Sequence, residues 1–188
     1  GRYDPAANGW SPVSTTGALT ARWAHSAVWS GTRMIVFGGK DTSIPTNTGG
    51  RYDPAADTWQ PTTTSGAPQF RRFHSAVWTG SEMVVWGGES SEILGDGRRY
   101  DPATDKWTAI GSAGAPTPRY HHSAVWTGAG GEMIVWGGYG AGGQLGDGAR
   151  WSRAADSWTP LPASGAPAPR YHHRAVWTGS DMLVWGGL

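Results

Sequence analysis

The sequence contains no cysteine, few charged residues and no long apolar segment, and each of these absences excludes a class of protein or site. Without cysteine among its 188 residues, the chain forms no disulfide, no thiolate metal site and no thiol nucleophile. Charged residues make up 15% of the chain and the formal net charge is +1, so nucleic acid or an anionic membrane surface is not indicated as the main partner. No apolar run approaches the roughly 20 residues of a membrane helix, and no signal-peptide pattern opens the chain, although a cleaved signal could already have been removed.

Helical periodicity is also missing, whereas glycine and tryptophan are abundant. No window combines a 3.6-residue apolar period with helix caps. The 30 glycines supply turns, and the 13 tryptophans supply large rigid side chains for burial. This composition predicts an all-β chain built from many short strands.

One sequence unit occurs four times along the chain. Each copy starts with R-x-x-H, continues through Ala-Val-Trp to a glycine turn, and ends with an apolar run closed by Gly-Gly. Such a pair of runs predicts a hairpin, and the lack of polar alternation predicts strands that are covered on both faces. The copies span residues 22–39, 71–88, 119–138 and 170–187.

A second unit, also present four times, places an aromatic residue seven positions before a tryptophan. In three copies the intervening residues begin with Asp-Pro-Ala, which suits a tight type I turn between two strands. The fourth copy has Ser152 and Arg153 instead, so its turn is expected to be looser or to be held by other contacts. The pairs are Tyr3 and Trp10, Tyr52 and Trp59, Tyr100 and Trp107, and Trp151 and Trp158.

These two units, joined by a variable loop, resemble the kelch repeat, whose marks are a strand ending in Gly-Gly and a Tyr followed seven positions later by Trp. The resemblance covers nearly the whole chain and implies a β-propeller with four-stranded antiparallel blades. It also implies a strand order in which the Ala-Val-Trp strand is innermost and the strand after the second tryptophan is outermost. The chain is thus expected to be a single domain, 1–188, with repeat units of approximately 22–70, 71–118, 119–169, and 170–188 together with 1–21.

How the ring closes is left open by the sequence. The first and last segments together make one whole blade, so a single chain can close as four blades, or two chains can exchange half-blades and close as an eight-bladed homodimer. A third alternative is that the chain is a fragment of a longer array. Closure in either form would remove unpaired strand edges.

Candidate ligand-binding residues gather at the rim where the inner strand begins and the second strand ends. Arginine with neighbouring aromatic residues suits the recognition of a peptide, a protein or a carbohydrate, and the resemblance implies partner binding at this rim. The recurring arginines have a second interpretation, as structural pins that tie blade to blade through backbone carbonyls. The candidates are Arg22, Trp23, Arg71, Arg72, Phe73, Asp96, Arg119, Tyr120, His121, Asp147, Arg170, Tyr171 and His172.

Metal binding and catalysis have little support in the sequence. A ring formed by His25, His74, His122 and His173 is a weak alternative for a metal site, since each histidine can instead satisfy a backbone group. Carboxylates show no spacing typical of acid and base pairs, and Glu82, Glu132 and Asp181, on the opposite rim, are expected to face solvent. We therefore expect no cofactor and a non-enzymatic binding or scaffold propeller. The alternatives are a sugar-processing enzyme similar to the sialic-acid epimerases of this fold, and a purely structural ring, natural or engineered.

Overall fold

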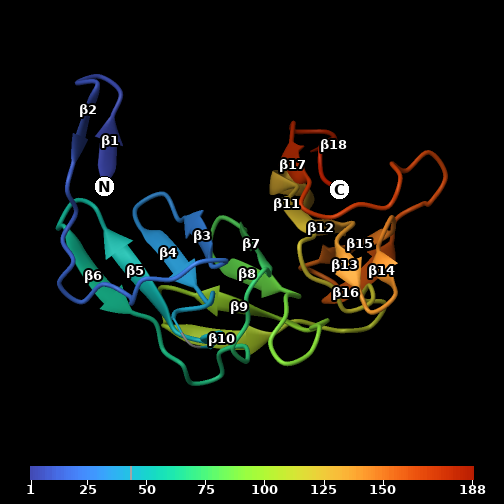
Figure 1. Cartoon of the computed structure of the whole chain (residues 1–188), viewed down its shortest axis with the longest axis horizontal. Coiled ribbons are helices and arrows are strands. Elements are labelled where there is room, and N and C mark those ends of the chain that lie inside the picture. The colour runs from blue at the N-terminus through green and yellow to red at the C-terminus, as the bar shows by residue number, and fades with distance from the viewer. Residues whose placement is uncertain (43) are drawn as a thin grey trace.

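The computed structural model describes residues 1–42 and 44–188, and it is built from antiparallel β-sheets (Figure 1). Three sheets have four strands each, and we call them blades 1, 2 and 3 in chain order. Blade 1 contains β3 (Ser26–Trp29), β4 (Met34–Phe37), β5 (Gly49–Asp53) and β6 (Thr58–Pro61). Blade 2 contains β7 (Ser75–Trp78), β8 (Met83–Trp86), β9 (Gly97–Asp101) and β10 (Lys106–Ala109). Blade 3 contains β11 (Ser123–Trp126), β12 (Glu132–Trp136), β15 (Gly148–Ser152) and β16 (Ser157–Pro160).

Two further hairpins are half-blades at the two ends of the chain. The N-terminal half-blade is β1 (Arg2–Asp4) with β2 (Gly9–Ser11), and the C-terminal half-blade is β17 (Arg174–Trp177) with β18 (Met182–Trp185). A short ribbon, β13 (Tyr139–Gly140) with β14 (Gly143–Gln144), lies in the variable loop of blade 3. In the described part of the chain the one helix is the 3₁₀ turn η1 (Gly128–Gly130), and no helix there is long and apolar enough to cross a membrane.

The strand order within each blade agrees with the order that the repeat pattern predicts. Blade 1 has the order β3-β4-β5-β6, and the inner strands of neighbouring blades contact one another from β3 through β7 and β11 to β17. The blades therefore fan around a common axis, with the half-blades at opposite ends of the arc (Figure 1). The two half-blades are separate two-stranded sheets, so no closed ring is present in the described residues.

The tight turns between the third and fourth strands form as the Asp-Pro-Ala pattern predicts. In blade 1 the Asp53 carboxylate accepts hydrogen bonds from the backbone N–H groups of Ala55, at 2.9 Å, and Ala56, at 3.2 Å. In blade 3, where the pattern is broken, the hydroxyl of Ser152 accepts from Ala155 N–H at 3.3 Å. Ser152 O also accepts from Asp156 N–H at 2.9 Å, so other contacts hold this turn.

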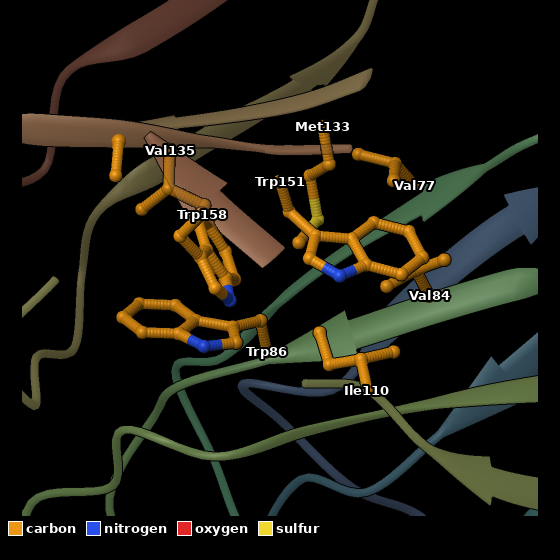
Figure 2. Packing of buried hydrophobic residues seen from close by; sticks show 9 residues of the cluster. Val77, Val84, Trp86, Ile110, Met133, Val135, Trp151 and Trp158 are labelled. Atoms are coloured by element: carbon orange, nitrogen blue, oxygen red, sulfur yellow. The ribbon is translucent and has the colours of Figure 1, made fainter. Parts of the chain in front are cut away.

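The core lies between blades, on the faces of the second strands. All four residues of β8 are buried, as expected for an apolar strand covered on both sides. Figure 2 shows Trp86 of blade 2 against Trp158 of blade 3, whose ring centroids are 5.3 Å apart, with Trp151 beside them. Fully buried aromatic side chains each remove a large apolar area from water, so this packing is a main source of stability.

The expectation that Glu82 faces solvent is wrong. Its side chain is only 15% exposed, and its carboxylate lies 2.7 Å from the guanidinium of Arg153 in the next blade. Arg153 occupies the place of the missing proline in the blade 3 turn, so the broken turn pattern gains an ion pair between blades. Glu132 is likewise half-buried and lies 3.4 Å from Arg150, whereas Asp181 is exposed as expected.

Candidate ligand-binding rim

The residue after each recurring arginine pairs with the residue after a diglycine, and these pairs form the rim. Tyr120 N–H donates to Tyr139 O at 3.1 Å, and Tyr139 N–H donates to Tyr120 O at 2.8 Å. Tyr171 and Leu188 exchange the same two bonds. Because one short antiparallel bridge recurs at the top of each repeat, equivalent side chains line up along the arc. The bridged pairs are Trp23 with Lys40, Arg72 with Glu89, Tyr120 with Tyr139, and Tyr171 with Leu188.

Aromatic side chains of the rim touch one another in an unbroken series across the three blades and the C-terminal half-blade, and we call this series the aromatic belt. Its ring-centroid distances range from 3.7 Å, between His121 and His172, to 6.3 Å, between Phe73 and Tyr120. Arg72 stacks on this surface, with its guanidinium carbon 5.1 Å from the centroid of the Phe73 ring, while Glu89 binds it at 2.6 Å. The belt consists of Trp23, Phe73, Tyr120, His121, Tyr139, Tyr171 and His172.

Three bulky residues of the belt adopt a backbone conformation that such residues rarely use. Phe73, His121 and His172 have φ values of 55°, 55° and 59°, and Ala24 occupies the same place in the first repeat with φ of 53°. This left-handed region is unfavourable for large side chains, and it concentrates at sites where function requires it. A chain of backbone bonds holds the conformation, since each N–H donates to the carbonyl of the equivalent residue in the preceding repeat, at 3.1–3.2 Å. These residues consequently project toward the axis.

A cavity at the axis collects all six histidines of the chain. It is lined by Ala24, His25, Phe73, His74, His121, His122, His172, His173 and Arg174. Burial lowers the pKa of His121 to about 4, and the nearby His172 and Arg72 lower it further in the same direction. Because His121 is neutral at pH 7, its ring offers one donor and one acceptor rather than a positive charge.

The R-x-x-H histidines join neighbouring blades. The Nε2 atom of His74 lies 2.8 Å from the hydroxyl of Ser26 in the preceding inner strand. His122 and His173 make the same contact with Ser75 and Ser123, at 2.8 and 2.7 Å. Three of the four histidines of the metal-ring alternative thus have Nε2 bonded to serine, and the described residues contain no cluster of three or more metal-ligating side chains.

The recurring arginines bond backbone carbonyls, as the structural-pin interpretation predicts, but the carbonyls belong to their own blade and not to a neighbouring one. Arg71 is 0% exposed, and its Nη1 donates to Gly87 O at 3.0 Å and to Asp96 O at 3.1 Å. Its remaining donors bind Gln69 O and the Asp96 carboxylate. Arg119, also 0% exposed, repeats this pattern with Gly137 and Asp147. Both guanidinium groups therefore use all five N–H donors inside the protein.

The predicted rim residues consequently divide into three groups. The arginines 22, 71, 119 and 170 lie beneath the rim, bonded to the diglycine carbonyls, with Asp96 and Asp147 as partners of two of them. Trp23, Arg72, Tyr120 and Tyr171 belong to the bridges, and Phe73, His121 and His172 reach the axis cavity. Lys40, Glu89, Tyr139 and Arg174 were not among the predicted rim residues. The first three directly follow a diglycine at the start of a variable loop, and Arg174 begins β17, where the other inner strands have serine.

Three diglycines and three aromatic-to-tryptophan pairs lie in four-stranded blades, the fourth of each lies in a half-blade, and comparison with known proteins agrees with this geometry. Residues 2–116 match the family model described as the KLHDC2/KLHL20/DRC7 Kelch-repeats domain. The chain belongs to this kelch-repeat family. A 56-residue stretch is 45% identical to the leucine-zipper-like transcriptional regulator 1 homolog of Drosophila melanogaster. That stretch is 29% of this chain and 6% of the relative, so the chain spans only a small part of the relative's length. Kelch-repeat domains commonly bind proteins.

Proposed function

We propose that this kelch domain is a non-enzymatic binding module whose aromatic belt recognises an exposed segment of a protein partner. The observation that carries the proposal is the unbroken contact of seven aromatic rings with Arg72 at one rim. Tyrosine, tryptophan and arginine are the residues that most often dominate protein–protein binding energy. Their rigid faces lose little conformational entropy on binding.

The charge and hydrogen-bonding capacity of the belt support a peptide rather than a highly charged ligand. Arg72 is already paired with Glu89, and His121 is neutral at pH 7. Burial raises the pKa of the Tyr120 hydroxyl, and the Glu89 carboxylate raises it further, so this hydroxyl stays protonated. The belt thus offers flat apolar faces bordered by neutral donors and acceptors, which suit backbone amides and apolar side chains.

Replacing Tyr120, His121, Tyr171 and His172 together by alanine is expected to abolish binding without unfolding the blades. Loss of one hot-spot residue costs about 2 kcal/mol or more, which is roughly a 30-fold weaker complex, and four such losses exceed what a micromolar complex can sustain. The measurement is a screen of wild type and variant on peptide and glycan arrays, with circular dichroism to verify folding.

A matched control carries alanine at exposed outer-strand positions, namely Gln60, Thr108 and Thr159. It is expected to keep every wild-type ligand. If the four-residue variant keeps all ligands, the belt is not the binding surface and the proposal is wrong. Hits confined to the glycan array would assign the belt to a carbohydrate instead.

Two alternative functions predict different results. A sugar-processing enzyme would turn over its substrate, which NMR of candidate sugars would detect as anomerisation or epimerisation. A purely structural ring would bind nothing on either array, with wild type as with variant.

The proposal includes closure of the ring, because a closed rim would surround the axis cavity with aromatic and histidine side chains. The half-blades can pair either within one chain or between two chains, and each leaves the belt at the same rim. Measurement of the solution mass separates the two, since one chain has a mass of 19.9 kDa.

A further inference from the structure

We infer that a second copy of this chain covers the open faces of the arc, so that β17–β18 of one copy and β1–β2 of the other form a single four-stranded blade. Two copies would then contain six complete blades and two shared ones, an eight-bladed ring with two-fold symmetry. The inference concerns the open strand edges and faces of the half-blades and does not depend on which ligand the belt binds.

The open faces expose aromatic residues whose equivalents are buried elsewhere in the same chain. Trp185 is 85% exposed, whereas its equivalents Phe37, Trp86 and Trp136 are 0%, 1% and 4% exposed. Trp10 is 76% exposed, although its equivalent Trp158 is buried at 5%. Large apolar side chains gathered on one face mark an interaction surface. Blade-to-blade packing buries the Trp185 position three times and the Trp10 position twice within the chain, so another kelch half-blade is the partner that fits them.

Each half-blade is already fixed on its complete neighbour. The guanidinium of Arg2 donates to Pro54 O at 3.2 Å, as Arg51 of blade 1 donates to Pro102 O of blade 2 at 2.9 Å. At the other end, His173 bonds Ser123 as the earlier histidines bond their serines. The two half-blades lie at opposite ends of the arc (Figure 1), so pairing them within one chain would require the blade junctions to bend. A second copy supplies the missing halves without such a change.

Two cavities lie beside the half-blades, where the missing strands of a shared blade would be. One cavity, beside β18, is lined on blade 3 by Ile134, Arg150 and Leu161 and on the half-blade by Trp177 and Met182. This is where the N-terminal half-blade of another copy would lie. A second cavity, beside β1, is lined by Val28, Trp29 and Met34 of blade 1 and would receive the C-terminal half-blade.

A repeated hydrogen bond assigns a partner to the exposed indole of Trp10. The indole N–H of Trp59 donates to Ser14 O at 3.1 Å, that of Trp107 to Thr63 O at 3.1 Å, and that of Trp158 to Gly111 O at 2.9 Å. In each case the acceptor lies four positions after the outer-strand tryptophan of the preceding repeat. The same count from Trp158 reaches Pro162, which lines the cavity beside β18.

The three residues whose carbonyls accept these indole bonds also donate their backbone N–H to an aspartate. At the open faces both the donor and the acceptor of this second bond are replaced. Asp57 accepts from Ser14 N–H at 2.9 Å, Asp105 from Thr63 N–H at 3.1 Å, and Asp156 from Gly111 N–H at 2.7 Å. At the shared blade the donor position is Pro162, which has no N–H, and the acceptor position is Asn8, which has no charge. A carboxylate facing Pro162 would have been left without its donor. The paired change indicates that Asn8 and Pro162 meet.

The repeat also fixes how the two copies pair. In blade 1, Met34 lies opposite Tyr52 and Ile35 opposite Arg51. The equivalent register places Met182 opposite Tyr3 of the second copy and Leu183 opposite its Arg2. The aromatic contacts of the blades extend in the same way, with Trp136 against Trp10 and Trp185 against Trp59 across the two interfaces.

The first experiment is sedimentation equilibrium of the 188-residue chain, where we expect a mass of about twice 19.9 kDa. An engineered disulfide tests which strands pair, and it can form only between the introduced residues because the chain has no native cysteine. Leu183→Cys with Arg2→Cys is expected to give a covalent dimer under oxidising conditions. A protein that stays at 19.9 kDa, forms an internal disulfide or assembles into larger species would overturn the inference.

A double-mutant cycle tests the Asn8–Pro162 contact itself. Asn8→Asp keeps the bond from Tyr3, as the Tyr52–Asp57 pair shows, but it places an unpaired carboxylate against Pro162. We expect at least a tenfold higher dissociation constant for the dimer, and recovery when Pro162→Ala restores the N–H donor in the double variant. Thr108→Asp, an added charge on an exposed outer strand, is the control and should leave the dimer unchanged. An Asn8→Asp dimer as tight as wild type, or a double variant no tighter than Asn8→Asp, would contradict the contact.

Discussion

Replacing Arg71 by alanine is expected to lower the free energy of unfolding by about 3–5 kcal/mol, because it removes a buried side chain together with all its hydrogen bonds. The carbonyls of Gly87 and Asp96 would each lose a donor, and the buried space of the guanidinium would become a cavity. Urea unfolding followed by tryptophan fluorescence measures the change. Arg71→Lys is also expected to destabilise the fold, since an ammonium group cannot reproduce the planar fork.

Arg170→Ala is the matched control for this prediction. Arg170 bonds Ala168 O and Gly186 O but is only half-buried, so a loss of about 1–2 kcal/mol is expected. If Arg71→Ala costs no more than Arg170→Ala, the buried arginine is not the pin that the bonding pattern indicates.

Acidification from pH 6.5 toward pH 4.5 is expected to destabilise the protein through its inter-blade histidines. Burial lowers the pKa of His74 to about 3 from its ordinary value of 6.5, with the charges of Arg71 and His25 acting in the same direction. Between these values the unfolded chain binds a proton that the folded chain does not, so stability falls as the pH falls. The slope is up to about 1.4 kcal/mol per pH unit for each such histidine. Burial and the charge of Arg119 lower the pKa of His122 in the same way, which adds a second contribution.

His74→Gln separates this effect from other titrations. The variant retains a group able to bond Ser26 but has nothing to protonate, so its stability is expected to fall less steeply by about 1.4 kcal/mol per pH unit. Carboxylates with lowered pKa values, such as Asp57 and Asp105, titrate below this range and do not contribute between pH 4.5 and 6.5. Urea unfolding at a series of pH values tests the prediction, and equal slopes for wild type and variant would refute it.

The sequence was a reliable guide to the repeating parts of the molecule. The Gly-Gly strands and the Asp-Pro-Ala turns follow from local patterns that recur in register, and the order of strands in each blade follows from the resemblance to the kelch repeat. The recurring arginines bond backbone carbonyls, as expected of pins, because a residue present in every repeat meets the same carbonyl each time. The carbonyl belongs to the arginine's own blade, however, and not to a neighbouring blade as expected.

Contacts between repeats were less accessible to sequence reasoning. The histidines were expected to satisfy backbone groups, yet the Nε2 atoms of three of them bond serines 47–50 residues earlier, in the preceding blade. Glu82 was placed in solvent because its partner, Arg153, is distant in sequence and appears in one repeat alone. Tyr139 joins the belt from a variable loop, where no periodic pattern marks it.

By itself, the sequence determined that this protein is an all-β kelch array with apolar strands and turns of defined type. These properties depend on local periodicity and on the chemistry of single residues. Only the tertiary structure decided which copies of a repeated residue are buried and which are free. Arg71 and Arg119 became enclosed pins, whereas the residues beside them joined one aromatic belt, because the curvature of the arc brings side chains from successive blades together at the rim. The same curvature separates the two half-blades and leaves Trp10 and Trp185 exposed for a partner.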